Sequence, residues 1–245
     1  MRLAVISDVH GNLLALEAVL ADIAAQAVDV TVNLGDLISG GLRPRETADL
    51  LMELDLPTVR GNHERQLLHT PVDRMSRSDR LAHEAMSPEH RAWLEALPST
   101  LEVDGDVLAF HGSPIDDLTY LLETVEPGGA RPATVQEVLD RLGPHAERRL
   151  LLCGHSHLQR SVVLPTGALV VNPGSVGWPA YDDDAPHPHV MEAGTPHARY
   201  ALLQDSADRW EVTFRAVEYD WEQAGRIAEA NDRPDIARAL RTGRT

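Results

Sequence analysis

Hydrophobic positions along the chain form short apolar runs of strand length, which alternate with longer segments of helical spacing. Residues 3–7 and 28–34 are rich in aliphatic side chains and predict buried strands. Residues 12–25 repeat apolar side chains at the spacing of a helix, and residues 44–54 do so after a leading proline, which suits a first helical turn. Residues 57–60 predict a third, short strand. This repetition implies a parallel sheet with helices outside it.

Beyond this repeat, the chain changes to strand pairs separated by turn residues. Helical spacing covers residues 67–97, where Ser87 followed by Pro88 predicts a helix start. A helix at 131–142 and a strand at 150–153 follow. Hairpin patterns predict three antiparallel pairs, at 101–103 with 107–110, 161–164 with 168–171, and 200–203 with 211–217. The second half is therefore predicted to be β-rich and antiparallel.

Residues 221–241 again carry apolar side chains at helical spacing, and Pro234 divides the segment. Such a helix packs on the sheet or on a second subunit. Both alternatives stay open, so a homo-oligomer is one possible assembly.

Two stretches, residues 112–132 and 173–197, look irregular, and the second is rich in proline, glycine, aspartate and histidine. Both follow predicted strands that end in polar residues. Either could overhang a cleft as a lid or a specificity loop. For the second stretch a disordered surface loop is an equal alternative.

Five short segments place metal-binding side chains beside glycine or at the end of a predicted strand. Open α/β folds bind their ligands at the carboxyl edge of the sheet, where these segments are expected to meet. One such segment alone is typical of a hydrogen-bonded turn or a surface pair. Together they predict a site for two metal ions. The segments are Asp8-Val9-His10, Gly35-Asp36, Gly61-Asn62-His63-Glu64, His111-Gly112 and Gly154-His155-Ser156-His157.

Length, charge and cysteine content limit the kind of protein that carries this site and the partners it can bind. A chain of 245 residues suits one domain over residues 1–245, and no apolar stretch approaches a membrane span. The net charge is −16, and all 22 basic residues are arginine, which argues against binding a nucleic-acid backbone. The single cysteine, Cys153, excludes a disulfide within the chain. We therefore expect a cytoplasmic protein that binds neither membranes nor nucleic-acid backbones.

The segments and their order resemble the calcineurin-like metallophosphoesterase superfamily, with its D-x-H, G-D, G-N-H-[DE], H and G-H-x-H blocks. Residues 7–12 and the stretch Asn172-Pro173-Gly174-Ser175-Val176 look most like the small bacterial phosphodiesterases of the YfcE type. The resemblance implies an α/β fold, a four-layer αββα sandwich of two mixed β-sheets flanked by helices. It also implies two divalent metal ions, for which manganese is the first choice and iron, zinc, nickel, cobalt or magnesium are alternatives.

Residue roles follow from the same resemblance. A carboxylate must lie between two cations, and the family pattern puts Asp36 in that bridging position. The other ligands implied are Asp8, His10 and His157 for one metal, and Asn62, His111 and His155 for the other. His63 is implied as the general acid that protonates the leaving alkoxide after in-line attack of a metal-bridging hydroxide.

Two further polar residues lie beside these ligands. Glu64 is expected to support them from behind or in a salt bridge, without a part in the chemistry. Asn12 either hydrogen-bonds a phosphate oxygen or caps the first helix, where asparagine is common.

Residues 37–40 separate two branches of the superfamily. Protein phosphatases that share the Gly-Asn-His block carry an arginine shortly after the bridging aspartate, and this chain has none there. A dianionic monoester would miss that partner, so a phosphodiesterase acting on small phosphodiesters or nucleotides is the first choice. A phosphomonoesterase acting on phosphoproteins or nucleotides, or a diadenosine polyphosphate hydrolase, remains an alternative. From another class, a non-catalytic scaffold of the same fold stays open.

Overall fold

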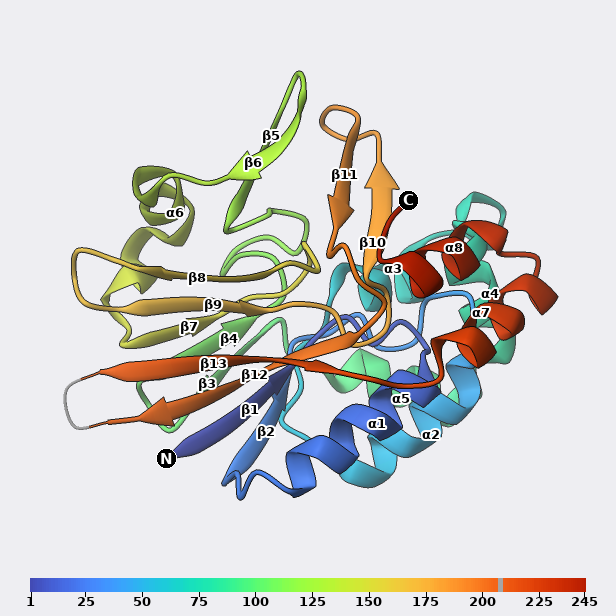
Figure 1. The fold of residues 1–245 in the computed structure, drawn as a ribbon, viewed down its shortest axis with the longest axis horizontal. Helices are drawn as coiled ribbons and strands as arrows, with labels where there is room; N and C mark the ends of the chain where they lie inside the picture. Colours follow the sequence, from blue (N-terminus) through green and yellow to red (C-terminus); the bar gives the residue numbers. More distant parts are fainter. Residues whose placement is uncertain (207–208) are drawn as a thin grey trace.

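Two β-sheets pack face to face at the centre of the structure, a computed structural model that describes residues 1–206 and 209–245. The first sheet has the order β13 (Trp210–Val217), β12 (Ala198–Asp205), β1 (Arg2–Ile6) and β2 (Val30–Asn33). The second has the order β3 (Thr100–Val103), β4 (Val107–Phe110), β7 (Leu150–Leu152), β9 (Leu169–Pro173) and β8 (Gln159–Val163). Figure 1 shows both sheets nearly edge-on.

Both sheets are mixed. Strand β1 is parallel to β2 and antiparallel to β12. In the second sheet β4, β7 and β9 are parallel to one another, and only the outer strands β3 and β8 run antiparallel. The prediction of an antiparallel second half is therefore wrong for these central strands. Hairpin patterns reveal pairing between chain neighbours, whereas β4 and β7 are joined by a long crossover.

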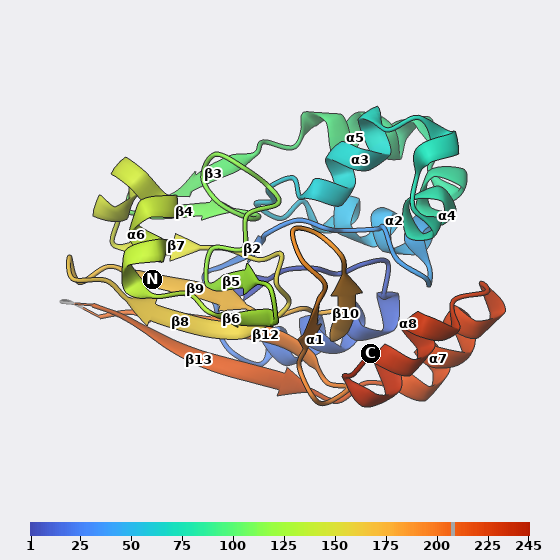
Figure 2. The same cartoon turned by 90° about the horizontal axis from the view of Figure 1, so that it is seen from above.

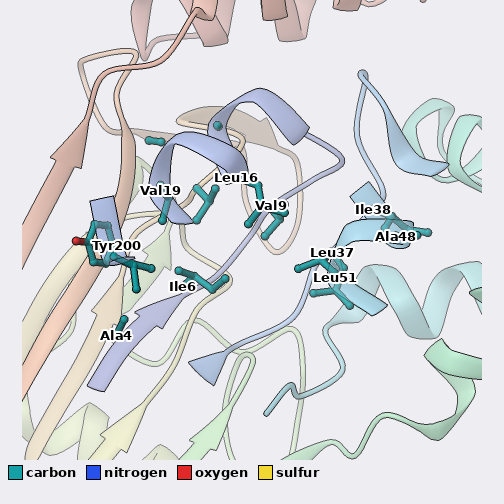
Figure 3. Close-up of a cluster of buried hydrophobic side chains, with 14 of the residues drawn as sticks. Ala4, Ile6, Val9, Leu16, Val19, Leu37, Ile38, Ala48, Leu51 and Tyr200 are labelled. Carbon is teal, nitrogen blue, oxygen red and sulfur yellow. The ribbon is translucent and has the colours of Figure 1, made fainter. Parts of the chain in front are cut away.

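Alternate side chains of β1 pack on opposite faces of the first sheet, in two different layers of the core. Leu3 and Val5 belong to the core between the two sheets, whereas Ala4 and Ile6 pack on the opposite face against helices. Figure 3 shows Ala4 and Ile6 together with Tyr200 of β12 in that second cluster. A third cluster joins the outer face of the second sheet to one further helix. The predicted four-layer αββα sandwich is confirmed.

Most helices cover the first sheet or extend beyond its carboxyl edge (Figure 2). They are α1 (Leu13–Ala24), α2 (Pro44–Leu54), α3 (Asn62–His69), α4 (Arg77–Ala85), α5 (Pro88–Ala96), α7 (Trp221–Ala230) and α8 (Pro234–Thr242). Helix α6 (Val135–Leu142) covers the second sheet, and 3₁₀ turns lie at Val72–Arg74 and Gly143–Glu147. In the part of the chain described here, no helix is long and apolar enough to cross a membrane.

The two irregular stretches each contain a hairpin. Strands β5 (Glu123–Glu126) and β6 (Gly129–Pro132) form the first, and β10 (Ala180–Asp183) and β11 (His189–Glu192) form the second. The helix predicted from residue 131 therefore begins later, at Val135, where the Thr134 hydroxyl caps it. The strand predicted at 57–60 is reduced to one bridge, between Asn33 and Thr58. Both views place β10–β11 between β5–β6 and α8.

A polar clamp fastens α1 to the first sheet. Asp22 of α1 accepts hydrogen bonds from the Tyr200 hydroxyl at 2.5 Å and from the Arg215 guanidinium at 3.0 Å. These bonds, that of Arg215 foremost, hold the pKa of Asp22 below its usual value. Because the native pKa is the lower one, the clamp stabilises the fold at neutral pH, and this contribution is lost as the pH falls through the native pKa.

Replacing Asp22 by asparagine is therefore expected to lower the free energy of unfolding by about 1–2 kcal/mol at pH 7. The difference from wild type should shrink as the pH falls below about 4, where carboxylates take up protons. Urea unfolding of both proteins between pH 7 and pH 3.5 measures this. Equal midpoints at pH 7 would contradict the clamp.

Candidate metal centre

All of the predicted ligands except Asn62, which begins α3, follow the end of a strand, and five of them have a left-handed backbone. Left-handed φ is uncommon outside glycine and costs about 1 kcal/mol or more, so it persists where the surrounding fold demands it. The five are Asp8 (φ 55°), His10 (φ 50°), Asp36 (φ 56°), His155 (φ 68°) and His157 (φ 60°). The turns after β1, β2 and β7 thereby bend out of the extended conformation, and their side chains converge.

One group combines Asp8 and His10, which follow β1, with His157, which follows β7. The Nε2 atom of His157 lies 3.3 Å from Asp8 Oδ1 and 3.1 Å from His10 Nε2. All three side chains are buried. One ligand atom from each lies within 4.8 Å of the others, a spacing that suits a metal ion.

A second group combines Asp36, His111 and His155, which follow β2, β4 and β7. His111 Nε2 lies 3.2 Å from Asp36 Oδ2 and 3.0 Å from the side-chain oxygen of Asn62. The same Asp36 oxygen is 3.9 Å from His10 Nε2 of the first group. Asp36 thus lies between the two groups, and every predicted ligand is part of one cluster.

Backbone carbonyls orient each imidazole of the cluster. A carbonyl oxygen only accepts, so the ring nitrogen bonded to it carries a hydrogen, and in the neutral ring the other nitrogen has a free lone pair. The bonds are His10 Nδ1 to Ser39 O (2.5 Å), His111 Nδ1 to Leu34 O (2.7 Å), His157 Nδ1 to Trp178 O (2.6 Å) and His155 Nε2 to Leu118 O (3.0 Å). This arrangement is typical of metal-binding histidines.

The histidines of the cluster differ in their pKa values. Burial lowers the pKa of His10 to about 3 and that of His155 to about 4, so both rings are neutral at pH 7. Burial also acts to lower the pKa of His111, but the charge of Asp36 and a hydrogen bond to it raise that pKa to about 10. A metal ion binding at His111 would therefore displace a proton.

The surroundings of the Asp8 carboxylate indicate whether the cluster suits cations. Asp8 is fully buried, and neither of its oxygens has a hydrogen-bond partner among residues 1–206 and 209–245. A buried carboxylate without partners costs several kcal/mol, and a bound cation removes that cost. The mixed oxygen and nitrogen donors fit divalent transition metals.

Glu64 organises the turn that carries Asp36. Its buried carboxylate accepts backbone hydrogen bonds from Asp36, Leu37 and Gly61 at 2.9, 2.8 and 2.9 Å. Gly61 has to be glycine, because a Cβ there would lie 2.2 Å from Asp36 Oδ1. The contacts of Glu64 are thus with backbone amides of the turns that carry Asp36 and Asn62, and none of these three is a salt bridge.

Residues 1–193 match the family described as the calcineurin-like phosphoesterase superfamily domain. The chain belongs to this superfamily. Among curated proteins, an uncharacterized protein from Methanocaldococcus jannaschii is 27% identical over an alignment of 246 positions, with 91% of this chain and 89% of that protein covered.

Two solved structures are similar over almost their whole length. A metallophosphoesterase from Sphaerobacter thermophilus has a TM-score of 0.75 and 28% identity, with 99% of this chain and 100% of that chain covered. A hypothetical protein from Pyrococcus horikoshii OT3 has a TM-score of 0.78 and 19% identity, with 99% and 98% covered, and this likeness concerns the fold alone.

His63 of this superfamily member lies in the first turn of α3, beside the cluster, with its side chain 20% exposed. Its Nδ1 is 2.8 Å from Asp79 Oδ1, and its ring meets that of His10 edge-on at 5.3 Å between centroids. Burial acts to lower the pKa of His63, but the charge of Asp36 and the hydrogen bond to Asp79 raise it to about 9. Without bound cations, His63 is therefore protonated at pH 7.

Asp79 is a neighbour of His63 that was not predicted from the sequence. It lies in α4, is buried, and accepts hydrogen bonds from the hydroxyls of Ser39 at 2.6 Å and Ser76 at 2.7 Å. Its only local signal is the spacing Ser76-x-x-Asp79, which is typical of a helix start. That pattern predicts the capping bond from Asp79 N to Ser76, but not the contact with His63.

Replacing Asp79 by asparagine should leave His63 without its charged partner, although Asn keeps the size of the side chain. We expect kcat to fall roughly 10-fold or more while KM changes little, because the ring loses orientation and proton affinity. Steady-state kinetics on the metal-loaded protein measures this split. An unchanged kcat would contradict the role of Asp79.

Asn12 caps α1. Its side-chain oxygen accepts from Ala15 N at 3.2 Å, and its amide group donates to Gly177 O at 3.0 Å and to the Tyr219 hydroxyl at 3.3 Å. The side chain is fully buried and both of its donor hydrogens are used. The geometry favours the capping role over contact with a phosphate oxygen.

A cavity of about 900 Å³ opens over His10, Asp36, Asn62, His63, His155 and His157. Its walls come from α4, from α8 and from both hairpin segments. Residues of stretches 112–132 and 173–197 line it, among them Tyr120, Trp178 and Tyr181. A phosphoester bound at the cluster would therefore have room for a sizeable organic group.

Proposed function

We propose that this superfamily member is a dinuclear metal-dependent phosphodiesterase that hydrolyses small phosphodiesters or nucleotides. One observation carries the proposal: two Asp–His groups meet at Asp36, and His63 lies at the edge of the same cavity. The cavity also receives Arg233 and Asp235 from the start of α8, which supports one domain over residues 1–245.

The cluster would hold two divalent ions. Asp8, His10 and His157 would bind one ion, Asn62, His111 and His155 the other, and Asp36 both. We propose manganese as the first choice. When bound, such ions polarise the phosphoryl group and supply a hydroxide nucleophile at neutral pH.

His63 would act as the general acid. Its Nδ1 is engaged by Asp79, so Nε2 is the nitrogen left to give a proton to the leaving alkoxide. The Asp79 carboxylate beside Nδ1 favours the protonated, cationic form of the ring.

The charges in the cavity wall favour a diester over a monoester. Within the described residues, all three arginines that line the cavity are engaged: Arg77 by Asp232, Arg141 by the carbonyl oxygen of Tyr120 and its neighbours, and Arg233 by Asp235. A second negative charge on a phosphomonoester would have to compete with these partners. Asp182 and Asp183 add negative charge at the rim.

The test compares bis-p-nitrophenyl phosphate with p-nitrophenyl phosphate, using metal-stripped protein before and after manganese is returned. We expect metal-dependent turnover with a higher kcat/KM for the diester. A preference for the monoester would replace the proposal with a phosphatase. Failure to bind any divalent metal would favour the non-catalytic scaffold.

A further inference from the structure

Two tyrosines from the hairpin segments contact the metal-binding histidines. The ring of Tyr120 stacks on His155, with centroids 4.6 Å apart and planes inclined by 19°. The carbonyl of Leu118, two residues earlier, accepts the Nε2 hydrogen of the same imidazole at 3.0 Å. The segment before β5 therefore holds His155 on its face and on its edge.

Tyr181 of β10 contacts the other histidine of the Gly-His-Ser-His segment. Its ring lies 4.6 Å from that of His157 at an angle of 65°, and its hydroxyl is 3.1 Å from the backbone oxygen of His155. One tyrosine thus packs on each imidazole, and the two imidazoles belong to different metal groups.

The two phenols are joined in a hydrogen-bonded chain. His189 Nδ1 donates to the carbonyl of His187, so His189 Nε2 accepts from the Tyr120 hydroxyl at 3.2 Å. The Tyr120 oxygen in turn accepts from the Tyr181 hydroxyl at 2.9 Å. Both hydroxyl hydrogens are used inside the protein. The phenols are therefore unsuited to donating to a substrate, although both rings border the cavity.

Each tyrosine is held from behind. The partly buried guanidinium of Arg141 donates to the carbonyl oxygens of Tyr120, Leu121 and Glu123 at 2.9, 3.0 and 2.9 Å. After β11, Gly194 N donates to the carbonyl of Gly243 at the C-terminal end of α8. Strands β6 and β11 of the two hairpins also lie against each other. The tyrosines therefore sit on anchored backbone.

We propose that Tyr120 and Tyr181 are positioning residues for the metal centre, which hold the His155 and His157 imidazoles in their metal-binding orientations. Both histidines have left-handed φ, which the isolated segment would not keep. An imidazole that is free to rotate also loses conformational entropy when it binds a metal ion. The inference rests on the proposed function, because it presumes that the cluster binds metal ions.

The experiment measures manganese and cobalt(II) binding to metal-stripped protein by chelator competition, and records the visible spectrum of the cobalt(II) form. The variants are Tyr120→Leu, Tyr181→Leu, Tyr120→Phe and Tyr181→Phe. Phe214→Leu is the matched control, because Phe214 packs on the core between the sheets, away from the cluster. Thermal unfolding without metal verifies that each variant folds.

We expect each leucine variant to lose about 10- to 100-fold in affinity for one of the two ions and to change the cobalt spectrum, as changes behind metal ligands do. The phenylalanine variants keep the ring and lose the hydroxyl chain, so about 5-fold is expected. Phe214→Leu should bind like wild type.

Wild-type affinity and an unchanged spectrum in the leucine variants would overturn the inference. If a leucine variant does not fold, its phenylalanine counterpart decides, and unchanged affinity there overturns it. If wild type itself binds no metal, the proposed function fails and this inference fails with it. If every variant binds two ions as well as wild type does, this inference alone fails.

Discussion

Replacing Asp36 by asparagine is expected to weaken both metal sites by at least about 100-fold and to reduce phosphodiester turnover to background. Asp36 Oδ2 is the atom that faces both groups, 3.2 Å from His111 Nε2 and 3.9 Å from His10 Nε2. Two cations a few ångström apart repel strongly, and a neutral amide cannot offset that repulsion. Metal content by atomic emission and turnover of bis-p-nitrophenyl phosphate measure the two effects.

Asp36→Asn removes the negative charge of the side chain and keeps its size. Asp36 Oδ1 accepts the backbone hydrogen of His63 at 3.0 Å at the start of α3, and the asparagine side-chain oxygen can keep this bond. Asp183→Asn is the matched control for metal content, since Asp183 also lines the cavity but lies outside both metal groups. Two ions bound by Asp36→Asn with wild-type affinity would refute the bridging position.

Replacing His63 by glutamine should lower kcat about 10²- to 10⁴-fold while both metal ions remain bound. Glutamine can hydrogen-bond but cannot donate a proton at neutral pH. The loss should be larger for an alkyl phosphodiester than for a p-nitrophenyl ester, because a poor leaving group depends more on protonation. Stopped assays with the two substrate types on metal-loaded protein measure the difference.

His145→Gln serves as the matched control, because His145 lies in the 3₁₀ turn after α6 and is not among the residues that line the cavity. A His63 variant that turns over both substrates at the wild-type rate would remove His63 from the chemistry. A variant that has lost its metal ions would show instead that His63 maintains the centre.

Local sequence patterns predicted much of the secondary structure. The helix predicted at 44–54 has those bounds in the structure, because a proline in the first turn and a regular apolar period act within one segment. Pro234 divides the C-terminal helices as expected. The β5–β6 hairpin was missed, because its turn at Pro127 and Gly128 lies between short, half-polar strands that have no apolar alternation.

The sequence by itself determined which side chains gather at the centre. Each of Asp8, Asp36, His111 and His155 follows a strand whose apolar pattern is visible locally, and parallel strands bring their carboxyl ends to one edge. Only the tertiary structure decided that Asp79 of α4 holds His63, and that Tyr120 and Tyr181 hold the histidines. Those contacts join elements far apart in the chain, and no spacing or period in the sequence records such a distance.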